Sequence, residues 1–93
     1  MKDAQRSRVL SETAERVALL NEFRTDDFQD GAVRLVNEAR ESWRDGDDLP
    51  PPGADPMFDA LVGIADAADS SPIAVRDACA AAFRAAEVAR VAR

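Results

Sequence analysis

The sequence predicts an all-α fold, a small four-helix domain of two helical hairpins joined by a proline-rich crossover. Apolar residues recur with a helical period of about 3.6, residues suited to capping precede the apolar runs, and no alternating strand pattern occurs. A chain of 93 residues is too short for two cores, so we expect one domain over 1–93. The expected helices span residues 4–24, 26–45, 56–69 and 72–91, with the crossover linker at about 45–55.

The first hairpin carries one apolar stripe on each helix. The first helix is expected to bury Val9, Leu10, Thr13, Ala14, Val17 and Leu20, with Phe23 at the edge of this face and Leu19 on the polar side. We expect Thr25 to cap the second helix, with Asp26 and Asp27 in its first turn. Gly31 suggests a close approach by a neighbouring helix, and Asp45–Gly46 is expected to end the second helix. The second stripe is Phe28, Ala32, Leu35, Val36, Ala39 and Trp43.

The second hairpin opens each helix with a cap residue followed by proline, Asp55–Pro56 and Ser71–Pro72. Proline is tolerated at the first helical position because its missing N–H would have no partner there. Pro50–Pro52 favour an extended segment that carries the chain between the hairpins. The third helix is expected to bury Met57, Phe58, Leu61, Ile64, Ala65 and Ala68, and the fourth Val75, Ala78, Cys79, Ala82, Phe83, Ala86 and Ala89.

Charge and composition indicate a soluble cytoplasmic protein. Twelve basic and eighteen acidic residues give a net charge of −6, which disfavours binding to nucleic acids or anionic membranes. No apolar run is long enough to span a bilayer, and we expect no signal peptide behind Met1. The single cysteine, Cys79, fits a reducing compartment.

The residues needed for common catalytic chemistry are missing, so we expect no enzyme activity, no cofactor and no metal site. There is no histidine, which removes the usual nucleophile–base pairs and the commonest metal ligand. Cys79 lies on an apolar stripe and is interpreted as a packing residue. Asp45–Asp48 are followed by Leu49 and Pro50, which do not continue a calcium loop.

The alanine-rich last helix buries little apolar area, so the core contains few large side chains. Association with a second protein chain would bury additional apolar area. We therefore expect a protein partner or a homodimer, and a small acidic interaction protein such as an adaptor, an antitoxin-like or phage-type inhibitor, or an accessory subunit. Off-stripe apolar residues and the acidic start of the second helix are the candidate partner-binding residues: Leu19, Val33, Asp26, Asp27, Asp30, Ile73, Val88 and Val91.

The alternative hypothesis is DNA binding by residues 64–83. Within this stretch a small polar turn joins two alanine-rich helices, a Ser-Pro pair opens the second, and Val75 and Cys79 face inward. The pattern resembles the helix-turn-helix of bacterial repressors. The resemblance implies that the second helix would enter the major groove, with Ser71 at phosphate and Arg76 at a base edge or the backbone.

Overall fold

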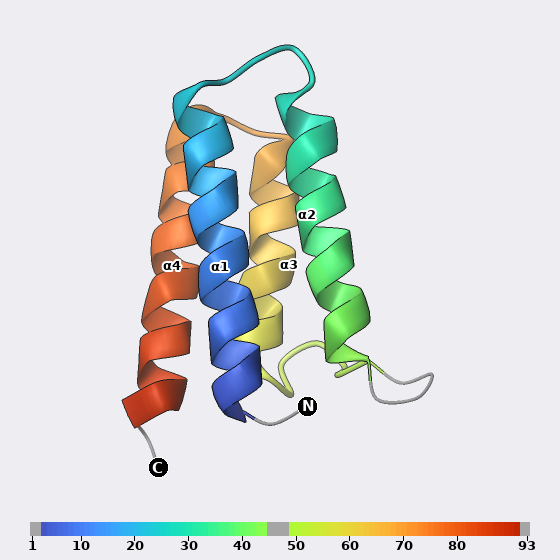
Figure 1. Cartoon of the computed structure of the whole chain (residues 1–93), viewed down its shortest axis with the longest axis vertical. Helices are drawn as coiled ribbons and strands as arrows, with labels where there is room; N and C mark the ends of the chain where they lie inside the picture. The colour runs from blue at the N-terminus through green and yellow to red at the C-terminus, as the bar shows by residue number, and fades with distance from the viewer. Residues whose placement is uncertain (1–2, 45–48, 92–93) are drawn as a thin grey trace.

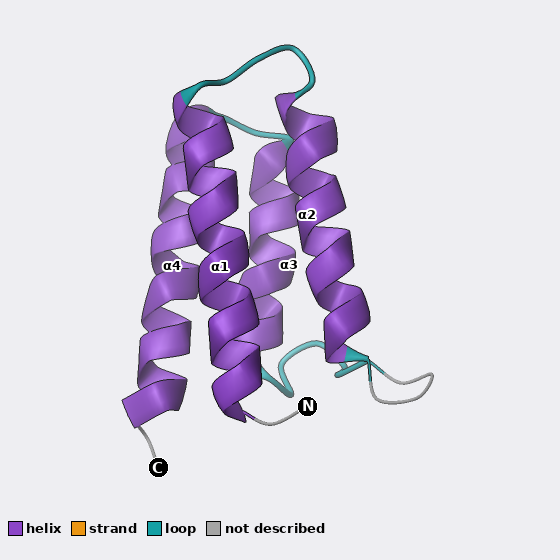
Figure 2. Ribbon diagram, in the orientation of Figure 1, coloured by secondary structure: helices purple, strands orange, loops and turns teal. Residues whose placement is uncertain are grey.

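The computed structural model describes residues 3–44 and 49–91, and it confirms the predicted all-α, four-helix fold. The helices are α1 (Asp3–Glu22), α2 (Phe28–Trp43), α3 (Pro56–Ala68) and α4 (Pro72–Val91), and the described residues contain no strand (Figure 2). None of these helices has the length and apolar character needed to cross a membrane.

The helices run alternately up and down, so each connection joins antiparallel neighbours (Figure 1). Each helix packs against the next, α4 returns against α1, and α1 also contacts α3 across the bundle. α4 and α2 form the two sides of the molecule, which measures 38 × 28 × 19 Å (Figure 1).

The core lies between the four helices and is rich in alanine. Of the seventeen described apolar side chains that are buried, six belong to alanine, which removes little area from water. The largest fully buried side chains are Trp43, Leu10, Leu61, Ile64, Val17, Val36 and Val75. The expected stripes therefore supply the core, with few large side chains in it.

Both helices of the second hairpin begin at the predicted caps. The Asp55 carboxylate accepts from the backbone N–H groups of Met57 (3.0 Å) and Phe58 (3.3 Å). The Ser71 hydroxyl oxygen accepts from the N–H of Ala74 at 3.1 Å. Pro56 and Pro72 are the first helical residues, as expected.

The boundary between α1 and α2 differs from the prediction. α1 ends at Glu22 and α2 begins at Phe28, two residues later than expected. Thr25 does not cap α2, because its hydroxyl donates to the Asp27 carboxylate and its carbonyl accepts from the N–H of Phe28. Asp27 occupies the cap position but makes no capping hydrogen bond with its side chain. The connection is therefore a separate turn stabilised by its own polar groups.

The other helix ends also shift slightly. α2 ends at Trp43 and α3 at Ala68, each before the expected residue. The predicted stop at Asp45–Gly46 and the linker residues Asp47 and Asp48 lie outside the described residues.

Three aromatic or aliphatic residues expected in or beside the core are instead exposed: Leu20 by 39%, Phe23 by 73% and Phe83 by 41%. Phe23 lies beyond the end of α1, where no neighbouring helix covers it. Leu20 lies over Gly31, and a Cβ added there would meet the Leu20 Cδ1 at 3.4 Å. This is ordinary contact with a side chain, so Gly31 marks only a modest approach of α1 to α2.

Asp55 also links three helices at the lower end of the bundle. Its second carboxylate oxygen accepts from the indole N–H of Trp43 at 3.0 Å and lies 3.6 Å from the Arg6 guanidinium. The Arg6 guanidinium lies 5.8 Å from the centre of the Trp43 ring. One carboxylate thus caps α3 and holds side chains from α1 and α2.

Candidate functional site

The structure distributes the sequence-predicted partner-binding residues over four places. Leu19 lies on the outer side of α1, Asp26 and Asp27 lie in the α1–α2 connection, Asp30 and Val33 lie on α2, and Ile73, Val88 and Val91 lie on α4. Val33 is half-buried, whereas Leu19 is 52% exposed. No single surface therefore contains all eight residues.

The acidic residues at the start of α2 are exposed to water. The hydrogen bond from Thr25 lowers the pKa of Asp27, and a backbone N–H lowers it further. Asp26 and Asp30 are also exposed. These carboxylates belong to a solvated turn and a helix start, where negative charge is favourable.

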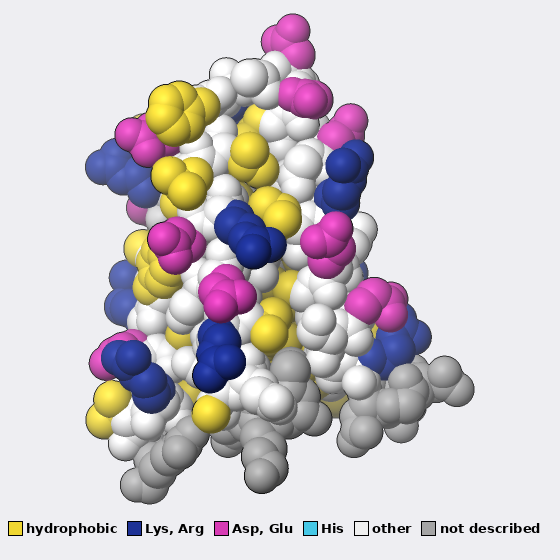
Figure 3. Space-filling view, viewed as in Figure 1, with side chains coloured by type: hydrophobic (Ala, Val, Ile, Leu, Met, Phe, Trp, Pro, Cys, Tyr) yellow, Lys and Arg dark blue, Asp and Glu magenta, His cyan; other side chains and the backbone are white. Residues whose placement is uncertain are grey.

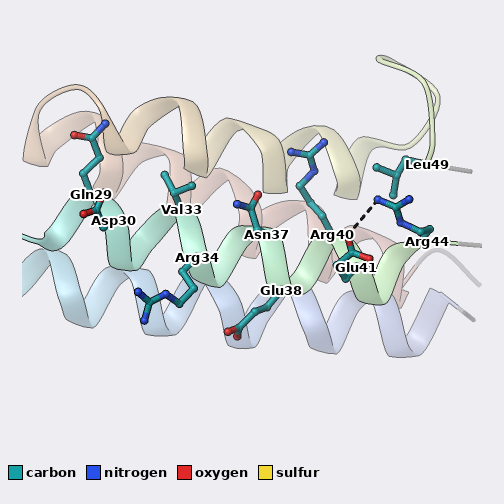
Figure 4. Close-up of a pocket in the computed structure, with 10 residues that line it drawn as sticks. All are labelled: Gln29, Asp30, Val33, Arg34, Asn37, Glu38, Arg40, Glu41, Arg44 and Leu49. Carbon is teal, nitrogen blue, oxygen red and sulfur yellow. Dashed lines mark hydrogen bonds and ion pairs between the residues drawn. The ribbon is translucent and has the colours of Figure 1, made fainter. Parts of the chain in front are cut away.

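A depression of about 930 Å³ follows the outer surface of α2. Figure 4 shows that Arg34 and Glu38 project to the side of α1. Val33 and Arg40 project to the opposite side, toward α3 (Figure 4). Since these groups diverge, the depression does not direct several polar groups at one bound molecule, as a small-molecule site would require.

A smaller depression of about 530 Å³ lies between α1 and α4 and includes Cys79, Phe83 and Arg76 in its lining. Cys79 is only 2% exposed, and burial raises the pKa of its thiol. A buried thiol with a raised pKa is a poor nucleophile. The predicted packing role of Cys79 agrees with this burial.

The outer side of α4 carries a second apolar stripe, away from the face that fills the core. Its members fall within an arc of roughly 100° on a helix with 3.6 residues per turn. We call these residues the α4 outer stripe: Ile73, Asp77, Ala80, Ala81, Arg84, Val88 and Val91. Ile73, Val88 and Val91 are 69%, 66% and 71% exposed, so the fold leaves their side chains largely in water.

Two opposite charges lie between these apolar residues. Asp77 and Arg84 are exposed, and neither has an ion-pair partner within the part of the chain that the structure describes. Ala80 and Ala81 are half-buried and separate the two charges. Ile73, Val88 and Val91 were predicted from the sequence, whereas Asp77 and Arg84 were missed. A helical projection centred on the outer face would have placed these two charges among them.

A depression of about 810 Å³ adjoins the lower part of this stripe, and its lining includes Val88 and Arg84 from α4 and the crossover residues Pro50 and Ala54. Two of its other polar residues, Arg6 and Asp55, lie within ionic range of each other and already serve the fold.

The residues proposed for DNA contact lie at the start of α4. The Ser71 hydroxyl is engaged as the cap of α4, and Arg76 is exposed. α3 and α4 run side by side as an antiparallel pair (Figure 1), whereas helix-turn-helix motifs cross at about 90–120°. This geometry does not favour insertion of α4 into a groove.

The face of the molecule seen in Figure 3 mixes charges of both signs. Figure 3 shows basic and acidic side chains interspersed over α1 and α2, with hydrophobic side chains gathered over the upper turns of α1 and the neighbouring edge of α4. Among residues 3–44 and 49–91, no three cysteine or carboxylate side chains cluster in a way that could hold a metal ion. No protein-family model, curated protein or solved structure gives a significant match to the chain.

Proposed function

We propose that this chain is a small, non-enzymatic protein-interaction module that binds through the α4 outer stripe. The observation that carries the proposal is the exposure of Ile73, Val88 and Val91 on a helix whose opposite face already fills the core. A helix that is apolar on two sides normally has both sides covered. Such a face would suit an adaptor, an antitoxin-like or phage-type inhibitor, or an accessory subunit.

Two further observations support binding rather than catalysis. The sequence has no histidine, and its one cysteine is a buried thiol with a raised pKa. The depression on α2 is open and lined by diverging charges rather than by converging polar groups (Figure 4). Charge of both signs across the surface favours a protein partner over a phosphate backbone.

The test compares the proteins retained by three immobilised forms of the chain. In the first variant, Ile73→Ser and Val88→Ser remove two exposed apolar side chains from the α4 outer stripe. The matched control, Leu19→Ser with Phe23→Ser, removes two exposed apolar side chains at the end of α1. Because Leu19 is itself a sequence-predicted candidate, this control also tests the α1 surface against the α4 outer stripe. None of these four positions is buried, so all forms should retain the wild-type circular dichroism spectrum.

The proposal expects proteins that are retained by the wild-type chain and by the control but lost with the α4 variant. Equal retention by all three forms would contradict the assignment of the α4 outer stripe. Recovery of nucleic acid as the only co-purifying species would contradict protein binding itself.

A further inference from the structure

The α4 outer stripe has a symmetry that identifies a specific partner. We infer that it pairs, antiparallel, with the same stripe of a second copy of this chain, with the two-fold axis passing between Ala80 and Ala81. This inference rests on the proposed function, because it names the partner that the stripe binds. It uses only residues of α4, which continues without interruption from Pro72 to Val91.

The charges match under this two-fold operation. Asp77 and Arg84 each lie three and a half residues from the midpoint between Ala80 and Ala81. At 1.5 Å per residue, each is roughly 5 Å from the axis, on opposite sides of it. In an antiparallel pair, Asp77 of each copy therefore faces Arg84 of the other, and two ion pairs form. A two-fold interface requires this kind of self-complementary patch.

Two of the three exposed apolar residues, Ile73 and Val88, match under the same operation, whereas Val91 lies beyond the matched segment. Ile73 and Val88 each lie seven and a half residues from the midpoint, so Ile73 of one copy meets Val88 of the other. The contact from Ile73 to Val88 is about 22 Å long at 1.5 Å per residue. Ala80 and Ala81 lie at its centre, where small side chains let two helices approach to about 8 Å, the close end of the usual range.

The opposite orientation is disfavoured by charge. A parallel pair in register would place Asp77 against Asp77 and Arg84 against Arg84, and like charges across an interface are strongly unfavourable. In the antiparallel pair, each copy supplies the charge that the other lacks. The unpaired state of Asp77 and Arg84 among the described residues is thereby accounted for.

The experiment uses charge reversal and analytical ultracentrifugation of the full chain. Asp77→Arg alone places four positive charges at the two-fold contact, and Arg84→Asp alone places four negative charges there. We expect wild-type chain to dimerise between about 1 μM and 1 mM, as suits a helix pair smaller than a standard interface. Each single variant should bind itself at least roughly tenfold more weakly.

An equimolar mixture of the two variants should recover the dimer. In the mixed pair, the arginine introduced by Asp77→Arg faces the aspartate introduced by Arg84→Asp, and the two unchanged charges also face each other with opposite signs. Recovery in the mixture would show that the single variants are folded, because mixing changes neither chain. Matched controls are Arg8→Asp and Asp66→Arg, which make the same charge changes at exposed positions of α1 and α3. These controls should dimerise like the wild-type chain.

A wild-type chain that stays monomeric over this range would overturn the inference. It would also be overturned if the single variants dimerise as strongly as wild type, or if their mixture remains monomeric. In any of these cases, a different protein that is retained by wild type and lost on Ile73→Ser with Val88→Ser would leave the proposed function standing. If no protein were retained by the wild-type chain and lost with this double variant, the proposed function would be contradicted as well.

Discussion

Replacing Asp55 tests whether one carboxylate holds the lower end of the bundle. One of its oxygens accepts from the first-turn N–H groups of Met57 and Phe58, and the other accepts from the indole N–H of Trp43. Asp55→Ala removes both sets of contacts at once. The side chain of Asp55 is only 14% exposed, so water replaces these contacts poorly.

The expected cost follows from two contributions. Loss of a capping carboxylate costs about 1 kcal/mol. The indole N–H of Trp43, a residue that is 1% exposed, would lose its acceptor, and an unsatisfied buried donor costs about 1–3 kcal/mol. The ion pair with Arg6 adds little, because its atoms are 3.6 Å apart and the arginine is partly exposed. Asp55→Ala should therefore lower the free energy of unfolding by about 3 kcal/mol.

The measurement is urea and thermal unfolding followed by circular dichroism and by the fluorescence of Trp43, the only tryptophan. A loss of about 3 kcal/mol corresponds to a fall in Tm of roughly 12–24 °C for a domain of this size. Asp55→Asn keeps one oxygen, which can still accept from the first-turn N–H groups. Its NH2 group cannot accept from the Trp43 indole, so the loss of unfolding free energy should be about half as large as for Asp55→Ala.

Asp66→Ala is the matched control, because this α3 carboxylate is exposed and should change the free energy of unfolding by less than about 0.5 kcal/mol. An effect of Asp55→Ala no larger than that of the control would refute the reasoning. Equal losses for Asp55→Ala and Asp55→Asn would refute a separate contribution from the cap.

Three further predictions concern two glycines and a perturbed carboxyl group. Gly63→Ala should raise the free energy of unfolding by about 0.5–1 kcal/mol, because Gly63 lies inside α3 with open space at its Cβ position. Gly53→Ala should lower the free energy of unfolding by about 1–2 kcal/mol, because Gly53 has φ +83°, which is unfavourable for alanine. Denaturant unfolding measures the change in free energy for both glycine variants. A change of opposite sign in either variant would contradict the reasoning for that glycine. Thr25→Val should raise the pKa of Asp27 toward its ordinary value, because the hydroxyl that lowers it is removed. The folded pKa is depressed, so the hydrogen bond stabilises the fold above the ordinary pKa and is lost as pH falls through the folded value. NMR titration of the Asp27 carboxyl carbon measures this shift, and an unchanged pKa would contradict it.

The features that the sequence predicted well are those set by neighbours along the chain. Asp55 and Ser71 cap α3 and α4 because a short polar side chain reaches N–H groups two or three residues later, whatever the rest of the fold does. The core stripes follow from helical periodicity in the same way. Fold class could therefore be predicted, and the helix boundaries to within two residues.

The features that the sequence predicted poorly depend on distant residues. Thr25 had the right chemistry for a cap, but its hydroxyl was taken by Asp27 in a wider turn. Phe83 shares a helical face with Cys79, yet it sits at the edge of the α1–α4 contact and stays 41% exposed. Periodicity gives the centre of a buried face, whereas its width depends on how closely the neighbouring helices approach.

The candidate site shows the same division. Exposed Ile73 and Val88 could be recognised from sequence as residues outside the core stripe of α4. The role of Asp77 and Arg84 could not be recognised from the sequence. Exposed charges are common on helices, and only the fold shows whether a charge has an ion-pair partner. Only the packed bundle shows that, among the described residues, these two charges lie unpaired between apolar residues.

The lean core and the exposed stripe are connected through α4. Its inner face contributes small side chains such as Cys79, Ala82 and Ala86, which let α1 and α3 pack closely but bury little area. Its outer face leaves large apolar side chains in water. A second copy on that face would bind the folded helix and not the unfolded chain. Association would therefore increase the free energy of unfolding of a bundle whose core buries little apolar area. Under this reasoning, one side of α4 serves a close-packed fold and the other a self-complementary contact.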